Sequence, residues 1–187
     1  EIIFNLIKDN VDEEIRDIGA INCFYRPPAG SLLDGFIGTN TDGEAALDPI
    51  KSQLTESHKL NIGLLGYGGA GKAIIAFLGR DFKRKHSVHV FNRSPINIKS
   101  SEKNNSYSYS LNDLEAFLPN CDLLINATSV GHIESIDITL VPKKLLAKAK
   151  KTMVVYDIIY DPLKTTLLKN SEEIGLTTIN GLRMNLI

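Results

Sequence analysis

The sequence predicts an α/β fold in which helices cover both faces of a doubly wound parallel sheet. Two observations indicate this class. From residue 60 onward, short apolar runs alternate with stretches whose apolar residues recur at helical spacing. A glycine-rich turn at residues 66–71 joins the first of these apolar runs to the stretch that follows it. Strands that alternate with helices in this way form a parallel sheet that is covered on both faces.

The composition is that of an ordinary globular protein. Of the 187 residues, 43% are hydrophobic and 23% are charged, which is enough apolar material for a core of normal size. The net charge of −1 gives no electrostatic reason to expect nucleic acid or an anionic membrane as a partner. No apolar run approaches the length of about 20 residues that a membrane helix needs. We therefore expect a cytoplasmic protein without a nucleic-acid or membrane partner. We also expect a monomer or homodimer.

The cysteines and histidines do not predict a metal site. Cys23 and Cys121 lack the spacing of a metal-ligand pair, and we expect both to be reduced thiols. The four histidines also lack metal-like spacing, and we interpret them as surface or strand residues. A core of this size closes without help from a metal or a disulfide.

The first part of the chain predicts a helix followed by a hairpin. Apolar residues spaced three and four positions apart predict a helix over residues 4–18. Apolar runs at residues 20–25 and 32–37 flank a turn-rich connection at residues 26–31, which is the signature of a β-hairpin.

The rest of the chain predicts helices and strands in alternation. A helix capped by Thr41 or Asp42 is expected to run to about residue 54. The strands predicted after it cover residues 61–65, 87–91, 122–126, 152–157 and 177–179. The helices between them cover residues 69–78, 111–118, 142–149 and 165–174. Residues 97–110 are rich in polar side chains and predict a loop.

The glycine-rich turn fits the pattern G-x-G-x-x-G, and its context makes the pattern informative. It follows a predicted strand and opens a predicted helix, as in the Rossmann fold that binds dinucleotides. Gly66 permits the tight turn, Gly68 lets the backbone approach a pyrophosphate, and Gly71 lets the helix pack closely on the strand. The N–H groups and the dipole at the start of the helix attract phosphates. The alternative is a tight strand-to-helix turn that binds no ligand.

The residues that follow the second strand of this unit favour NADP over NAD. An NAD site usually has an acidic residue here, which binds the ribose 2′-hydroxyl. This chain instead has Asn92, Arg93 and Ser94. A guanidinium donates two parallel hydrogen bonds to a phosphate, so we expect NADP as the cofactor. The alternative is that Arg93 is a solvated residue at the end of a strand.

A series of short segments, taken in order, resembles the shikimate dehydrogenase family over almost the whole chain. The segments are G-A-I-N at residues 19–22, N-T-D-G at 40–43, the glycine turn with Lys72, N-R-S at 92–94, I-N-A-T-S at 125–129, D-I-I-Y-D-P at 157–162 with Thr165, and N-G-L-R-M at 180–184. Each segment alone has modest specificity, whereas the whole set in this order is highly specific to the family.

The resemblance implies three residues that act on the substrate. Asp42 would be catalytic and would bind the substrate, and Asn22 and Tyr160 would contact it. Asp42 could instead serve only to cap the helix that starts beside it. Asn22 could be a turn or strand-end residue whose amide is satisfied within the protein, and Tyr160 could be an amphipathic tyrosine at the edge of the core.

The glycine pattern and the resemblance together imply the cofactor-binding set. The set comes from the glycine turn, the segment after the second strand, the I-N-A-T segment and the N-G-x-x-M segment: Gly66, Gly68, Gly69, Ala70, Gly71, Asn92, Arg93, Ser94, Asn126, Ala127, Thr128, Gly181 and Met184. Asn126 could alternatively do no more than end its strand. No metal ligand belongs to the set.

The activity that the resemblance implies is the NADPH-dependent, reversible reduction of 3-dehydroshikimate to shikimate, in chorismate and aromatic amino-acid biosynthesis. The cofactor would supply the hydride, while the protein would position the substrate and handle one proton. A quinate/shikimate dehydrogenase-like paralogue is one alternative, and a non-catalytic NADP-binding module is another. A protein–protein scaffold would leave the glycine turn and Arg93 unexplained.

The resemblance also predicts how the chain is divided. We expect residues 1–40 to be a remnant of the family's N-terminal substrate domain with its hinge, and residues 41–187 to be the NADP-binding domain. Members of the family carry a lysine in a P-x-K-E segment, and by spacing Glu1 would directly follow that lysine. A substrate-binding glutamine of the family would fall just beyond Ile187. Because both ends look cut, we expect this chain alone to bind NADP without turning over shikimate.

Overall fold

The computed structural model describes residues 11, 13–28, 35–55, 58–82, 85–94, 96 and 105–186. The strands are β1 (Cys23–Tyr25), β2 (Ile37–Thr39), β3 (Asn61–Leu65), β4 (Ser87–Asn92), β5 (Ser106–Ser110), β6 (Leu123–Asn126), β7 (Val154–Asp157) and β8 (Thr177–Ile179). The α-helices are α2 (Glu13–Ile18), α3 (Asp42–Leu47), α4 (Lys51–Thr55), α5 (Gly69–Asp81), α6 (Leu114–Phe117), α7 (Lys143–Leu146) and α8 (Thr166–Glu173). The 3-10 helices are η1 (Asp48–Ile50), η2 (Leu111–Asp113), η3 (Leu118–Asn120), η4 (Ile133–Ser135) and η5 (Arg183–Asn185). Within the described residues, no helix has both the length and the apolar character that crossing a bilayer requires.

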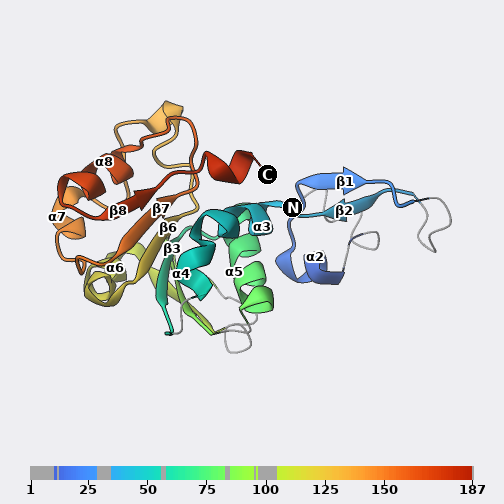
Figure 1. The fold of residues 1–187 in the computed structure, drawn as a ribbon, viewed down its shortest axis with the longest axis horizontal. Helices are drawn as coiled ribbons and strands as arrows, with labels where there is room; N and C mark the ends of the chain where they lie inside the picture. Colours follow the sequence, from blue (N-terminus) through green and yellow to red (C-terminus); the bar gives the residue numbers. More distant parts are fainter. Residues whose placement is uncertain are drawn as a thin grey trace.

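Within the described part of the chain, six parallel strands form one sheet in the order β5-β4-β3-β6-β7-β8. The chain leaves β3 for one edge of the sheet and returns to β6 on the other side of β3, so the strand order reverses between β3 and β6 (Figure 1). This arrangement confirms the predicted doubly wound α/β class. In such sheets, ligands bind outside the carboxyl ends of the strands at the point of reversal.

Side chains alternate between the two faces of the sheet. Ile62 and Leu64 of β3 belong to the core on the α5 side, together with Ile74 from that helix. Leu65, at the end of β3, belongs instead to the core on the α6, α7 and α8 side, together with Leu114. Because successive residues of a strand point to opposite faces, both faces of the sheet are apolar and both are covered by helices.

The predicted N-terminal helix and hairpin are partly described. The helix expected over residues 4–18 is confirmed at Glu13–Ile18, and residues 4–10 and 12 lie outside the described residues. Strands β1 and β2 pair antiparallel, from Cys23 opposite Thr39 to Tyr25 opposite Ile37. The second strand therefore lies further along the chain than the expected residues 32–37, of which residues 32–34 are outside the described part. Val11 bridges Gly38 of the same strand, which places this pairing at residues 37–39.

The predicted helix over residues 41–54 is present but interrupted, and its cap differs from the prediction. Helix α3 passes into the 3-10 turn η1 before α4 begins, because Pro49 has no N–H to donate to the preceding turn. Neither Thr41 nor Asp42 caps the helix through its side chain. The Oδ1 atom of Asn40 instead accepts hydrogen bonds from the N–H groups of Asp42 (3.0 Å) and Gly43 (3.3 Å). Thr41 therefore occupies the N-cap position, as predicted, but the side-chain hydrogen bonds that cap the helix come from Asn40, one residue earlier.

The loop predicted over residues 97–110 is wrong at its end, because Ser106–Ser110 form the edge strand β5. Residues 97–104 lie outside the described residues. Tyr107 and Tyr109 stack on His89 of β4, with ring centroids 5.4 and 5.6 Å apart. An edge strand needs few apolar residues because it is only partly buried, so its serine and tyrosine alternation looked like loop sequence.

His86 differs from its interpretation as a surface or strand residue, since it is buried and precedes β4. Its Nδ1 accepts a hydrogen bond from the Leu60 N–H (3.2 Å), and its Nε2 donates to the Leu54 carbonyl oxygen (3.0 Å). These two bonds use the neutral ring in one tautomer and connect the end of α4 to the start of β3. Burial lowers the pKa of His86 below its ordinary value.

We predict that acid destabilises the fold through this histidine. In the unfolded chain His86 gains a proton near its ordinary pKa of about 6.5, whereas in the folded chain the lowered pKa keeps it neutral. The free energy of unfolding should therefore fall as pH drops from about 7.5 to about 5. Urea unfolding across this range should show a smaller pH slope for His86→Gln than for the wild type, and equal slopes would contradict the prediction.

Candidate active site at the carboxyl edge of the sheet

The glycine turn between β3 and α5 is shaped by two close contacts. Gly66 has φ of +91°, and a Cβ there would lie 2.6 Å from Cγ2 of Thr128. A Cβ on Gly71 would lie 2.6 Å from the carbonyl oxygen of Gly66. Both positions therefore require glycine, one for its backbone conformation and for the close approach of the next loop, the other for the packing of α5.

The start of α5 is open toward the outside. Gly68 precedes the helix in an extended conformation (φ −77°, ψ −165°), and a Cβ on it would meet nothing within 4 Å. Gly68 and Gly69 are exposed and Ala70 is half-buried. The N–H groups of the first turn of a 13-residue helix therefore face accessible space. This combination of free donors, helix dipole and absent side chains fits a pyrophosphate.

Strand β4 brings the proposed 2′-phosphate segment to the same edge. Phe91 of β4 pairs with Leu65 of β3, and the N–H of Gly66 donates to the Phe91 carbonyl oxygen (2.9 Å). Asn92 ends the strand half-buried, and Arg93 and Ser94 are exposed directly after it. The guanidinium of Arg93 thus follows the strand that neighbours the glycine turn, which is where the ribose end of a dinucleotide lies in this fold.

Asn126, at the end of β6, uses its side chain within the protein. Its Nδ2 donates to Oδ1 of Asp157 (3.0 Å) and to the Val130 carbonyl oxygen (3.2 Å). Its Oδ1 accepts from the N–H (3.2 Å) and the hydroxyl (2.7 Å) of Thr128. Asn126 therefore orders the loop from Ala127 to Val130, which reaches Gly66 through Thr128. Its own amide is thereby occupied within the protein.

Asp157, at the end of β7, is a buried carboxylate beside Asn126. It has no exposed surface, and its Oδ1 accepts from the Asn126 amide and the Ile159 N–H (3.1 Å). Its Oδ2 accepts from the Thr165 hydroxyl (2.7 Å). Burial raises the pKa of Asp157 to about 6, although the hydrogen bonds from Thr165, Ile159 and Asn126 lower it. We did not predict Asp157 as a site residue. Its signals in the sequence were its place at the end of a predicted strand and at the start of the D-I-I-Y-D-P segment.

Asn22 and Asp42, predicted to act on the substrate, lie together. The Nδ2 of Asn22 donates to Oδ1 of Asp42 (2.6 Å) and to the Thr41 hydroxyl (3.0 Å), and its Oδ1 accepts from the Thr41 N–H (3.0 Å). Asn40 caps α3, so Asp42 is not needed as a cap and its carboxylate is held at the start of the helix. Among the described residues, no hydrogen bond reaches Oδ2 of Asp42, which leaves this oxygen able to bind a ligand.

The last predicted segments meet after β7 and β8. Tyr160 is 51% exposed, and no hydrogen bond between described residues joins it to Asn22 or Asp42. A Cβ on Gly181 would lie 1.9 Å from the Ile158 carbonyl oxygen, so the turn at Gly181 packs directly on the segment that carries Tyr160. Met184 packs against the core on the α5 side. The structure therefore gathers the cofactor segments at one edge and presents Tyr160 beside them.

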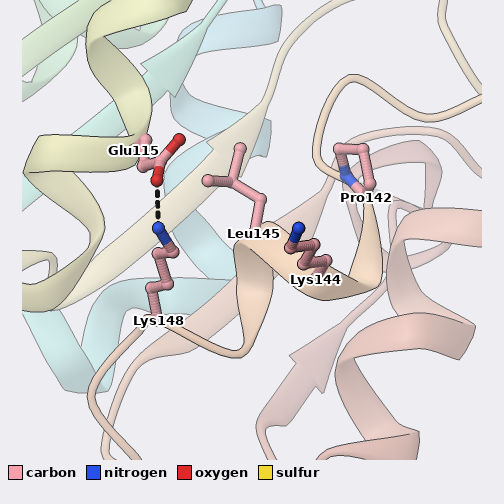
Figure 2. Close-up of a pocket in the computed structure, with 5 residues that line it drawn as sticks. All are labelled: Glu115, Pro142, Lys144, Leu145 and Lys148. Atoms are coloured by element: carbon pink, nitrogen blue, oxygen red, sulfur yellow. Dashed lines mark hydrogen bonds and ion pairs between the residues drawn. The ribbon is translucent and has the colours of Figure 1, made fainter.

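Surface hollows lined by described residues also occur away from this edge. One lies against α6 and α7 and is lined by Glu115, Pro142, Lys144, Leu145 and Lys148 (Figure 2). Its Lys148 is paired with Glu115, so one of its two cations is already neutralised.

Comparisons with known proteins find relatives that match most of the chain. The shikimate dehydrogenase (NADP(+)) of Pyrococcus abyssi is 37% identical over 176 residues, which cover 94% of this chain and 61% of that enzyme. A crystal structure of the shikimate dehydrogenase of Aquifex aeolicus superposes with a TM-score of 0.76 and 30% identity, over 100% of this chain and 64% of that one. The shikimate 5-dehydrogenase of Thermus thermophilus in complex with NADP(H) and shikimate superposes with a TM-score of 0.71 and 28% identity, over 94% and 61% of the two chains. No family model matches the chain. The chain thus spans about three fifths of the length of these relatives.

We predict that alanine at two glycines of the turn changes the free energy of unfolding by very different amounts. Gly71→Ala should lower the free energy of unfolding by about 1–3 kcal/mol, because its Cβ would overlap the Gly66 carbonyl oxygen. Gly68→Ala should change it by less than about 0.5 kcal/mol, because the added carbon meets nothing and φ is ordinary. Urea unfolding of both variants measures the difference. Equal losses would show that the contact between Gly71 and the Gly66 carbonyl oxygen does not shape the turn.

Proposed function

We propose that this chain, which belongs to the shikimate dehydrogenase family over the length that it shares with its relatives, is the NADP-binding part of an enzyme that reduces 3-dehydroshikimate reversibly to shikimate. We assign the cofactor to residues 41–187 and a remnant of the substrate domain to residues 1–40. The substrate is the small-molecule partner in this proposal, and a cytoplasmic monomer or homodimer in aromatic amino-acid biosynthesis is its setting.

One observation carries the proposal. The glycine turn, the strand end that precedes Arg93 and the Asn126 loop converge where the strand order reverses, and they do so through contacts that need these residue types. Gly66 has to be glycine for Thr128 to approach, and the open start of α5 leaves room for phosphates. The relative from Thermus thermophilus, named as a complex with NADP(H) and shikimate, supports the choice of both ligands.

NADP fits the residues at this edge. Gly68, Gly69 and Ala70 would hold the pyrophosphate through backbone N–H groups, and Arg93 with Asn92 and Ser94 would bind the 2′-phosphate. Gly181 and Met184 would flank the nicotinamide, and Ala127 and Thr128 would lie beside the cofactor. When bound, NADPH supplies the hydride that protein side chains cannot provide.

Asn22 and Asp42 would bind the substrate next to that cofactor. Because the Asn22 amide donates to Oδ1 of Asp42, the carboxylate is fixed with Oδ2 directed away from this bond. Oδ2 would accept a hydrogen bond from a substrate hydroxyl and so orient the reacting carbon. A carboxylate that is held before the substrate arrives loses little freedom on binding, which favours reaction in the correct geometry. Tyr160, exposed on its loop, would contact the substrate from the β7 side.

The proposal is tested by NADPH fluorescence titration of this chain and by shikimate oxidation with NADP in a version that is extended at both ends to the length of its relatives. We expect Asp42→Asn to bind NADPH as the wild type does and to lower turnover by at least about 10²-fold. Loss of NADPH binding in this variant would place Asp42 in the cofactor site. Absence of both NADPH binding and turnover in the wild type would reject the proposal.

We predict that Arg93 selects NADP over NAD. Arg93→Ala should weaken NADP binding by about 1.5–3 kcal/mol, the scale of a charge-assisted hydrogen bond, and leave NAD binding unchanged. Arg80→Ala is the matched control, because Arg80 is an exposed arginine in the last turn of α5, at the other end of that helix from the glycine turn. Titration with both cofactors checks the assignment. Equal losses for NADP and NAD, or an equal effect of Arg80→Ala, would refute it.

A further inference from the structure

Asp157 connects two segments that the proposed function uses separately. Toward β6, it accepts the hydrogen bond of Asn126, whose Oδ1 in turn holds Thr128 beside Gly66. We call this route the cofactor arm. Toward its own strand end, Asp157 accepts from the Ile159 N–H with one oxygen and from the Thr165 hydroxyl with the other. We call this second route the substrate arm.

The substrate arm closes the loop that carries Tyr160. Ile159 and Thr165 lie on either side of Tyr160 in the chain, so their bonds to one carboxylate fix both ends of the loop. Thr165 also accepts from the Leu168 N–H (3.3 Å) and so caps α8. A Cβ on Gly131 would lie 3.4 Å from Cβ of Thr165, which shows that the end of the Asn126 loop packs against the same threonine. The two arms therefore meet again beyond Asp157.

The burial of the Asp157 carboxylate destabilises the fold. It has no exposed surface, and no ion pair between described residues neutralises it. Three neutral donors stabilise it, yet burial still raises the pKa of Asp157 to about 6, so above this pH the folded chain holds an ionised group that it disfavours. An apolar residue at the end of a buried strand would stabilise the sheet without this cost. The hydrogen bonds that Asp157 receives thus matter more for the positions of the segments that they join than for the stability of the fold.

We propose that Asp157 is a positioning residue, which holds the Thr128 loop against the glycine turn and the Tyr160 loop beside it in one fixed arrangement. The proposal rests on the proposed function, in which these loops border the cofactor and the substrate. Two carboxylate oxygens serve three donors, and no other side chain of this size does so. An amide at this position must place an NH₂ group either against Thr165 or against Asn126 and Ile159, so one arm always loses its acceptor.

The test compares Asp157→Asn with Asp122→Asn. Asp122 is a matched control, because it also accepts a backbone N–H, from Asn61 (2.7 Å), but lies at the opposite edge of the sheet and pairs with Lys150. We expect Asp157→Asn, made in the version that is extended at both ends, to raise the dissociation constant of NADPH, the KM for shikimate, or both, by about tenfold at pH 8, as small displacements of binding groups do. Asp122→Asn should leave both within about twofold. Unchanged constants in Asp157→Asn, or equal changes in both variants, would overturn the inference.

A second pair of variants separates the arms and does not depend on the folding of Asp157→Asn. Thr165→Val removes the hydroxyl that donates to Asp157, and Thr165→Ser keeps it. We expect Thr165→Val to raise the KM for shikimate with little change in NADPH binding, and Thr165→Ser to restore the wild-type KM. Equal KM values in the two variants would overturn the substrate arm. Failure of the wild type to bind NADPH would instead reject the proposed function itself.

Discussion

The close approach of α5 to the end of β3 sets the position of the glycine turn relative to the loop that follows β6. Gly71 lies so near the Gly66 carbonyl oxygen that a Cβ would come within 2.6 Å of it, and Gly66 lies equally near Thr128. Because both residues are glycines, no side chain keeps the helix, the turn and the neighbouring loop apart. The N–H groups at the start of α5 are therefore held at a fixed distance from the loop after β6, and a ligand that binds them also meets Thr128.

Much of the parallel sheet could be predicted because its strands are buried on both faces. Strands β3, β6 and β7 read as continuous apolar runs, and their positions follow from the sequence within a few residues. Strand β5 could not be recognised, since an edge strand of serine and tyrosine has no apolar run. The capping role of Asn40 was equally hidden, because Thr41 and Asp42 are good capping residues and only the backbone decides between neighbours.

The candidate site also contains features that the sequence predicted and features that it did not. Local patterns predicted the glycine turn, because the need for glycine there arises between residues close in the chain. The pairing of Asn22 with Asp42 was implied by resemblance only, and the Asn126–Asp157 bond was not predicted at all. Both bonds join residues that are far apart in sequence. The register between β6 and β7 brings Asn126 and Asp157 together. The spacing of residues along the chain does not reveal this register.

The packing of η5 against α3 and η1 has a mechanical consequence. Met184 of η5 lies in the core on the α5 side, and Arg183 pairs with Asp48 (2.7 Å), which follows directly on the helix that Asp42 begins. The exposed ion pair adds little energy, so the packing of η5 against α3 and η1 is the contact that holds Met184 near the start of α3. Met184 therefore keeps its position relative to the start of α3 by packing, whereas Asn22, which directly precedes β1, keeps its place beside Asp42 by hydrogen bonds.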